Sequence, residues 1–537
     1  MFNRASTSAR TGAGRWAALA VLCVAALMVN LDNTILNVAL PTLVDRLQAT
    51  TEELEWIVDA YLLVFGGLLL VAGSLADRFG RQKLFIAGLL TFGGGSLGAA
   101  FSGGAETLIA WRAVMGLGAA MSIPAGLAVV NDIFRVPAQR ARALSLWSGT
   151  IGLGIAIGPV IGGVLLAHFA WGSIFFVNVP VTAAGVVGAL LLVPDSRDPH
   201  PRRPDLAGGA LSILGLGLVL WAIIEGPNHG WSSAEVLGTL IGGVVVMAAF
   251  LLWERRSDHA MLPLRYLRVR RFSIAMLALA LCIFGLSGGL FLQTQFLQFF
   301  LGLSPFDAGI RMLPIAAMLV VGAGVSQPAV RLVGTRFTVS AALLLITGGL
   351  LQIYAITSIT TTYVDCLPGL MLIGLGAGLL IPAGVDSVLG SVSQQDSGVG
   401  SATNSTALQV GGALGVAVVG SVLSTRYQSY LQPALAVHHV PASVASTILG
   451  SLGGALGVAK VVGGPLGAGL ASLARSGFVQ GERAALLAAL AVIGAGALLA
   501  LLALPSLRSR RQRAASPAEA APDARAAVSE ELRSGAG

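Results

Sequence analysis

Charged residues are scarce in this sequence. Asp, Glu, Lys and Arg together make up 11% of the 537 residues, whereas a soluble domain carries about 25%. Hydrophobic residues make up 55%, and the mean hydropathy is +0.82. This composition excludes an ordinary water-soluble domain and predicts a polytopic membrane protein.

Lysine, cysteine and histidine are rare as well. The two lysines, Lys83 and Lys460, lie outside any GxxxxGK-S/T loop, which argues against an ATP-driven pump. The three cysteines show no CxxC spacing and the six histidines no HExxH motif, so no disulfide framework, metal site or cofactor is predicted. The net charge of +8 comes from short basic breaks between apolar runs, so a nucleic-acid partner is not expected.

Apolar runs long enough to cross a bilayer are abundant instead. A spanning helix needs roughly 20 predominantly apolar residues. Windows of this kind, separated by charge-bearing breaks, predict an all-α protein with fourteen spans, at about 15–37, 54–75, 84–103, 106–130, 144–167, 174–194, 206–225, 236–253, 272–297, 308–330, 337–357, 366–389, 398–424 and 482–505.

The basic residues support this number of spans. With the N-terminus in the cytoplasm, 26 of the 33 Lys and Arg residues fall on the cytoplasmic side and five fall outside. The bias would collapse if one early span were missed, because every later loop would change sides. We therefore expect both termini in the cytoplasm. We expect no cleavable signal peptide, since the first apolar run is long enough to span.

One break is irregular. The segment 425–481, expected outside the membrane, is long and contains a weakly apolar, glycine-dense stretch at 445–471. An external helical hairpin, a re-entrant element and a flexible loop are all compatible with it. Two additional spans are a poor interpretation, because Lys460 would lie near a bilayer face.

The break after the second span reads "GSLADRFGRQK", residues 73–83. Gly80 can adopt the left-handed conformation that a tight turn between two helices needs. Asp77 and Arg78 can pair with each other or bond the ends of neighbouring helices. A basic loop that only sets topology is the alternative interpretation. The candidate gating residues here are Gly73, Asp77, Arg78, Gly80 and Arg81.

Further motifs lie in and around the spans. "LDNTILNVALP" (31–41) holds an acid in the first span, "LIAWRAVMGLGAA" (108–120) holds Arg112, and "GSATNSTALQVGGALGVAVVGSV" (400–422) is rich in small and polar residues. In "GLGIAIGPVIGG" (152–163), small residues and a proline allow a kinked, closely packed helix: Gly154, Gly158, Pro159, Gly162 and Gly163.

Together with the loop 73–83, these stretches resemble the motifs of the major facilitator superfamily, in particular its fourteen-span drug:H⁺ antiporters of the EmrB/QacA type. The resemblance implies two six-span bundles around a substrate cavity that opens alternately to each side. The expected division is a cytoplasmic N-terminus (1–14), two bundles (15–194 and 272–505, the latter including 425–481), a linker with two inserted spans (195–271) and a disordered cytoplasmic tail (506–537).

Three charges lie inside the predicted N-terminal bundle. Counted at about 1.5 Å per residue, Asp32, Asp59 and Arg112 all lie roughly 8–9 Å from the outer ends of their spans. Pairing one acid with Arg112 offsets the cost of burial, and the other acid then competes for the same cation or takes up a proton. The family resemblance ties the first-span aspartate and the fourth-span arginine to proton coupling. A static ion pair, with Asp59 facing water, is the alternative.

Uncharged polar residues accompany these charges. Asn33 and Asn37 could hydrogen-bond or hydrate the first-span acid. The possible cavity residues are Asn33, Asn37, Asp386, Asn404 and Gln409. Asp386 is either a second protonation site or a helix-end aspartate near water. Where some members of the resembled family carry acids in the thirteenth span, residues 403–409 carry none, which favours uncharged or monocationic lipophilic substrates over divalent cations.

The sequence thus predicts a secondary active exporter and not an enzyme. It would exchange protons for lipophilic drugs, antibiotics or biocides across a bacterial inner membrane, as a lipid-embedded monomer. The alternative is an exporter dedicated to one endogenous lipid, siderophore or secondary metabolite. A channel is less favoured, because the kinked fifth span and the three embedded charges are typical of an alternating carrier.

Overall fold

The structure, a computed structural model, describes residues 12–198, 204–257, 264–392 and 397–504. The predicted disordered tail, 506–537, and most of the predicted N-terminal segment, 1–14, lie outside the described residues. Every regular element within the described ranges is a helix. The expectation of an all-α protein is therefore confirmed.

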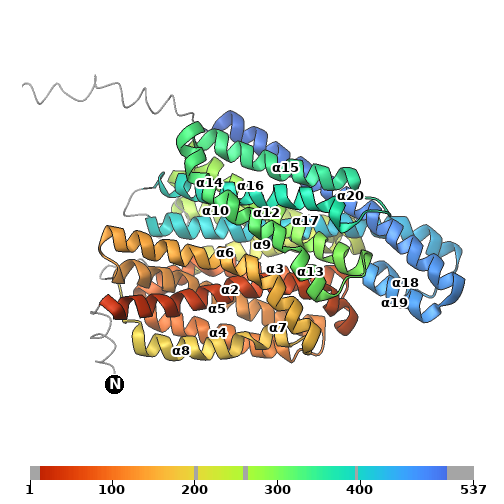
Figure 1. The fold of residues 1–537 in the computed structure, drawn as a ribbon, viewed down its shortest axis with the longest axis horizontal. Coiled ribbons are helices and arrows are strands. Elements are labelled where there is room, and N and C mark those ends of the chain that lie inside the picture. Colours follow the sequence, from red (N-terminus) through yellow and green to blue (C-terminus); the bar gives the residue numbers. More distant parts are fainter. Residues whose placement is uncertain (1–11, 199–203, 258–263, 393–396, 505–537) are drawn as a thin grey trace, which may run out of the picture.

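The N-terminal half of the chain, drawn in red to yellow in Figure 1, forms the lower layer of the molecule. Its helices are α2 (Gly12–Leu47), α3 (Thr51–Phe79), α4 (Arg81–Ala100), α5 (Ala105–Ile133), α6 (Pro137–His168), α7 (Ser173–Phe176) and α8 (Asn178–Leu192). Two further helices, α9 (Leu206–His229) and α10 (Ala234–Arg256), follow as a packed pair, and α9 also contacts α3 and α17.

The C-terminal half, drawn in green to blue, forms the upper layer (Figure 1). Its elements are α11 (Leu264–Leu267), α12 (Arg270–Gln295), the π-helix η1 (Phe296–Phe300), α13 (Pro305–Arg311), α14 (Leu313–Val333), α15 (Thr335–Ile356), α16 (Tyr363–Leu389), α17 (Ser397–Val437), α18 (Ala442–Gly450), α19 (Leu452–Val462) and α20 (Gly464–Ala503).

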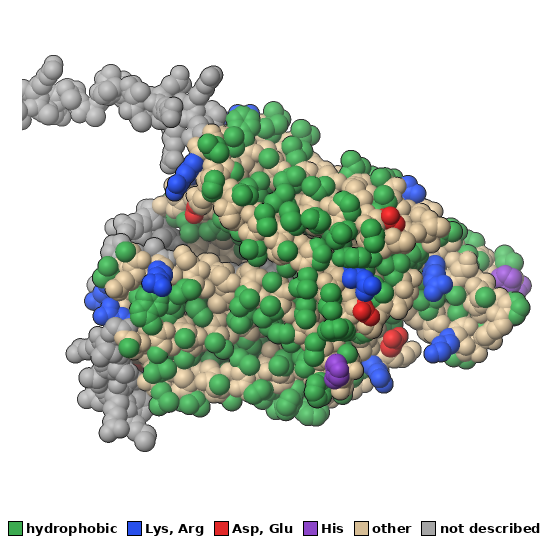
Figure 2. Space-filling view, viewed as in Figure 1, with side chains coloured by type: hydrophobic (Ala, Val, Ile, Leu, Met, Phe, Trp, Pro, Cys, Tyr) green, Lys and Arg blue, Asp and Glu red, His purple; other side chains and the backbone are tan. Residues whose placement is uncertain are grey.

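Thirteen helical segments of the described chain are long and apolar enough to cross a bilayer, and α6, which bends by 42° near residue 155, makes a fourteenth if it counts as one span. Each of the fourteen predicted spans has a helical counterpart. Figure 2 shows apolar side chains over the middle of the visible face and charged ones toward its two ends. The molecule is thus a multi-pass membrane protein.

Several helix boundaries follow from local chemistry. Thr50 and Glu53 form a capping box at the start of α3, in which the Thr50 side chain accepts from the Glu53 N–H and the Thr50 N–H donates to the Glu53 carboxylate. Gly80 separates α3 from α4 with a φ of +117°, a conformation that disfavours side chains. The turn predicted at Gly80 is therefore present.

The segment 425–481 is helical and does not form a flexible loop. Helix α17 continues to Val437, α20 begins at Gly464, and the short helices α18 and α19 lie between them. The Tyr427 hydroxyl of α17 donates to the Ile448 carbonyl of α18 at 3.0 Å. Figure 1 shows α18 and α19 at the right-hand end of the molecule, opposite the first described residues. We call this end the α18/α19 end.

The two halves meet closely at the α18/α19 end. Gln298 of η1 donates to the Val38 carbonyl of α2 at 2.8 Å, and Ser424 of α17 donates to Glu52 of α3 at 3.1 Å. Figure 2 shows a hollow between the two layers at the opposite, left-hand end. The structure is therefore closed at the α18/α19 end and parted at the other.

Candidate functional site

A buried ion pair joins two helices of the N-terminal half. Asp32 of α2 and Arg112 of α5 contact through Oδ2 and Nη1 at 2.6 Å, and their side chains are 1% and 0% exposed. Sequence reasoning placed both charges at a similar depth, and the structure brings them together. Because the pair is desolvated, removal of either charge would leave the other buried without a counter-ion, which is strongly destabilising.

A second contact holds the other oxygen of the aspartate. Asn178, at the start of α8, donates through Nδ2 to Asp32 Oδ1 at 2.8 Å and to Ser96 Oγ of α4 at 3.0 Å. Ser96 in turn donates to the Phe175 carbonyl at 2.8 Å. Both carboxylate oxygens of Asp32 therefore have partners, on α5 and α8, and Asn178 links this acid to α4. Sequence reasoning missed Asn178 and Ser96, for which the only signal was a polar residue in an apolar run.

Arg112 also contacts α3. Its Nε donates to the Ile57 carbonyl at 3.0 Å, and its guanidinium lies 4.3 Å from the centre of the Tyr61 ring. The backbone of α3 approaches α5 closely because Gly116 has no side chain; a Cβ there would lie 2.6 Å from the Tyr61 carbonyl. Nη2 has no hydrogen-bond partner among the described residues. The arginine thus ties α2, α3 and α5 together and keeps one donor free.

Asp59 does not share this cation. Its side chain is 0% exposed, and neither carboxylate oxygen has a hydrogen-bond partner in the described chain. The water-facing alternative considered for Asp59 therefore does not hold in this conformation. Direct competition with Asp32 for Arg112 is not seen either. The role of Asp59 in proton transfer stays a prediction.

The asparagines of α2 bond to their own helix. Asn37 donates to the Asn33 carbonyl at 3.0 Å, and Asn30 donates to the Ala26 carbonyl at 2.7 Å. The structure shows no hydrogen bond from Asn33 or Asn37 to Asp32 in its described contacts. The amide that bonds to Asp32 is instead that of Asn178, which lies on a helix far away in the sequence.

The loop after α3 binds the segment that follows α8. Asp77 pairs with Arg81 (Oδ1 to Nη2, 2.8 Å) and not with Arg78, whose guanidinium lies over the Phe79 ring. The Arg81 N–H donates to the Ser196 carbonyl at 2.9 Å. A Cβ at Gly80 would lie 2.7 Å from Asp195 Oδ1, so this glycine is needed for space as well as for its φ. Gly73 has only a distant neighbour at the position of its missing Cβ.

The glycines of α6 serve two interfaces. On one side Gly154, Gly158 and Gly162 admit α2, and Thr34 of α2 donates to the Gly154 carbonyl at 3.0 Å. On the other side a Cβ at Gly163 would lie 2.7 Å from Phe306 of α13, and the Pro159 carbonyl lies against Gly309. The motif therefore packs α6 between Asp32's helix and the C-terminal half, as its composition predicted for a closely packed, kinked helix.

The predicted residues of the C-terminal half lie in different places. Gln409 of α17 packs against Gly66 of α3, and the buried Asn404 has an oxygen without a partner in the described chain. Asp386 is exposed and accepts from Gln327 of α14. Asn404 and Gln409 therefore belong to the helix that meets α3, whereas Asp386 fits the helix-end interpretation.

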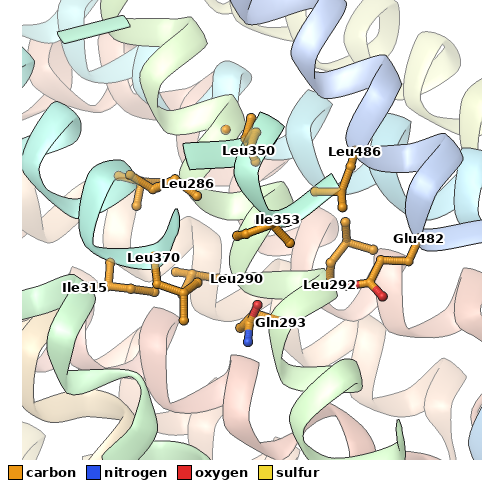
Figure 3. Close-up of a pocket in the computed structure, with 13 residues that line it drawn as sticks. Leu286, Leu290, Leu292, Gln293, Ile315, Leu350, Ile353, Leu370, Glu482 and Leu486 are labelled. Atoms are coloured by element: carbon orange, nitrogen blue, oxygen red, sulfur yellow. The ribbon is translucent and has the colours of Figure 1, made fainter. Parts of the chain in front are cut away.

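A small cavity of about 20 Å³ lies within the C-terminal half, among α12, α14, α15, α16 and α20. Figure 3 shows it surrounded by leucines and isoleucines, with Gln293 and Glu482 as its polar residues. Glu482 is 3% exposed, and its Oε2 and the Gln293 amide nitrogen have no partners in the described chain. The volume suits one water molecule and not a drug.

Comparisons with known proteins agree with this architecture. The family described as "Major Facilitator Superfamily" matches residues 22–416. The multidrug efflux pump LfrA of Mycolicibacterium smegmatis is 33% identical over 92% of this chain and 97% of its own length. The tetracenomycin C resistance and export protein of Streptomyces glaucescens is 33% identical over 76% of each chain. The methylenomycin A resistance protein of Bacillus subtilis is 33% identical over 79% of this chain and 91% of its own.

Solved structures are similar as well. A bacterial homologue of the human lysosomal transporter Spinster, in an inward-facing and unoccupied conformation, superposes with a TM-score of 0.64 over 92% of this chain and 97% of its own, at 17% identity. That likeness concerns the fold alone. Together the matches confirm the resemblance inferred from the loop 73–83 and the span motifs, and the relatives' names agree with the prediction of a drug exporter.

Proposed function

Because the chain belongs to the Major Facilitator Superfamily, we propose that it exports lipophilic drugs, antibiotics or biocides in exchange for protons. The names of its relatives support export of such compounds. Proton coupling is supported by one observation above all, the buried Asp32–Arg112 pair with its 2.6 Å contact. An ionisable acid that is buried on α2 and bonded to both α5 and α8 is suited to convert proton binding into helix movement.

The proposed cycle uses this pair as its switch. In the state with the α18/α19 end open, a proton binds Asp32 and removes its negative charge. Arg112 then loses its ionic partner and keeps only the Ile57 carbonyl and the Tyr61 ring, so the contact between α2 and α5 weakens. Release of the proton at the other end restores the pair.

We place the parted end of the structure on the cytoplasmic side of a bacterial inner membrane. The Lys and Arg bias supports this orientation, with both termini in the cytoplasm. Substrate would enter the hollow between the halves from the cytosol or the inner leaflet. The exporter would work as a monomer surrounded by lipid, in keeping with the apolar belt of Figure 2.

The polar residues of α17 support a proposal for the substrate class. Asn404 and Gln409 offer amides, and residues 403–409 contain no acid. We therefore propose uncharged or monocationic lipophilic substrates. A second candidate is a dedicated exporter of one secondary metabolite, favoured by relatives named for a single compound, such as the tetracenomycin C export protein.

Efflux from everted membrane vesicles tests both candidates. An imposed pH gradient should drive transport of dyes, biocides and antibiotics, and a response to a single compound would favour the dedicated exporter. Absence of any response to the gradient would reject both. A charge exchange, Asp32→Arg with Arg112→Asp, separates the role of the ion pair from that of the proton carrier. The exchanged pair keeps its electrostatic attraction, but its acid now lies on α5.

A further inference from the structure

Helices α3 and α17 form the seam between the two halves on one side of the molecule, and α9 covers it. At the α18/α19 end this seam is closed by Ser424, which donates to Glu52, and by Thr51, which donates to the Gly450 carbonyl of α18 at 2.8 Å. Between these contacts and Asp59 lies Glu55, which the proposed cycle does not use.

Glu55 points across the seam from one half to the other. Its carboxyl occupies the space left by Gly420 of α17, where any side chain would clash with it. The side chain is 0% exposed, and neither oxygen has a hydrogen-bond partner among the described residues. A carboxylate in this position would be buried without compensation, which is costly, whereas a neutral carboxyl is tolerated.

Among the described residues, the charged groups that act on Glu55 are acids. Glu52 and Asp59 lie on the same face of α3, three and four residues away, and Glu225 comes from α9. Helix α17 presents Gly420 and Ser424 to this stretch, and its Arg426 is exposed. The cation of α5, Arg112, is paired with Asp32.

The remaining titratable neighbour is His229 of α9, which lies 3.7 Å from Glu225 and not against Glu55. In the described chain, no group of three or more His, Cys, Asp or Glu side chains is arranged to hold a metal ion. A proton suits Glu55, because it removes the charge of a buried carboxylate that has no hydrogen-bond partner in the described chain.

We propose that Glu55 is a proton-binding site whose protonation allows the α3–α17 seam to close at the α18/α19 end. This inference rests on the proposed exchange of protons for substrate. When the halves part at this end, Glu55 meets water and its carboxylate is solvated. When they close, the carboxyl enters the seam as the neutral acid. Proton binding from that side thus favours closure there, because the closed state admits only the protonated form.

The test measures seam closure directly, in the full-length protein and without substrate or pH gradient. Spin labels at Arg46→Cys on α2 and Tyr430→Cys on α17, both exposed at the α18/α19 end, report the distance between the halves in lipid nanodiscs across a pH series. The native cysteines are first replaced by alanine and transport is checked. If closure binds one proton at Glu55, the closed-to-open ratio rises about tenfold for each unit of falling pH.

Two variants and a control decide the outcome. Glu55→Gln mimics the protonated acid and should stay closed, with the pH slope reduced by about one proton. Glu55→Asp keeps an acid at this position, so the closed-to-open ratio should still depend on pH. This variant provides a second measurement if Glu55→Gln folds poorly. Glu106→Gln removes an exposed acid at the start of α5 and should behave as wild type.

An unchanged slope in Glu55→Gln would overturn the proposal, and so would distances that depend on Na⁺ when choline replaces it at constant pH. The result is independent of export. Vesicles that show no gradient-driven efflux would reject the proposed function while leaving a proton-dependent seam intact.

Discussion

One acid in each half of the molecule, Asp32 and Glu482, is buried in a different way. In the N-terminal half Asp32 bonds to a cation, Arg112 of α5, and to an amide donor, Asn178 of α8, which itself donates to Ser96 of α4. In the C-terminal half Glu482 borders an apolar cavity and has an oxygen without a partner in the described chain. The adjacent Arg483 lies over the Tyr354 ring.

This difference indicates that the two acids have different roles in proton coupling. A buried acid with a cation can change the packing of several helices when it binds a proton, because its partner is released. Glu482 lies among helices of the C-terminal half and has no ion pair in the described chain, whereas Glu55 lies at the seam between the halves. Glu482 therefore has no partner to release and remains compatible with the fold as a neutral group. We therefore expect the moving charge to reside in the N-terminal half, and four substitutions test this from the largest effect to the smallest.

Removing the charge of Asp32 should have the largest effect. Asp32→Asn should abolish efflux driven by a pH gradient, and by leaving Arg112 buried without a counter-ion it should lower stability by about 3–5 kcal/mol. Vesicle efflux and thermal unfolding measure the two effects. The double variant Asp32→Asn with Arg112→Gln should recover stability and not efflux. Recovery of gradient-driven efflux as well would make the pair a static structural contact.

Loss of Asn178 should have an intermediate effect. Asn178→Ala removes a hydrogen bond to a charged group, with a cost of about 1.5–3 kcal/mol. Efflux should continue with an altered dependence on pH, since Asp32 keeps Arg112 and loses its second partner. The matched control is Ser96→Ala, which removes only neutral contacts and should cost about 0.5–1.5 kcal/mol. Equal pH profiles for wild type and Asn178→Ala would contradict a positioning role.

Neutralising Glu482 should change little. Glu482→Gln keeps the volume of the side chain and removes an acid that has no ion pair in the described chain, so thermal stability should be equal or higher and gradient-driven efflux unchanged. A loss of efflux in a well-folded variant would show that the C-terminal half also carries a coupling proton. The comparison between the halves would then have to be abandoned.

Asp386 should matter least. It is exposed and bonds to Gln327 at the end of α16, so Asp386→Asn should leave efflux and thermal stability within experimental error. A clear loss of transport would restore the alternative of a second protonation site at this position.

Much of the fold could be predicted because the length of an apolar run, which predicts a spanning helix, can be read from the local sequence alone. The windows from 15–37 to 482–505 each correspond to a helix, and the turn at Gly80 follows from its residue type. The segment 425–481 was harder, since its dense glycine fits several structures. Packing against the extended ends of α17 and α20 stabilises helices there that weak local propensity left undecided.

The site was predicted in part. Asp32 and Arg112 could be matched by depth, since charges in spans need partners. Asn178 could not, because it lies 146 residues from Asp32 in the sequence and the start of α8 had to be placed beside α2 and α4 first. Glu55 lies at the edge of the predicted span 54–75, where an acid is ordinarily expected to reach water. The structure nevertheless buries it completely.

The sequence by itself determined that this chain is a multi-pass helical transporter, which ionisable residues lie within its spans, and which glycines allow close packing. These follow from composition, run length and motif. Only the tertiary structure decided which acid holds the arginine, which acids stay without a partner, and at which end the halves close. Those outcomes depend on contacts between helices distant in the chain, and in a desolvated interior a few ångströms decide whether a charge is paired or costly.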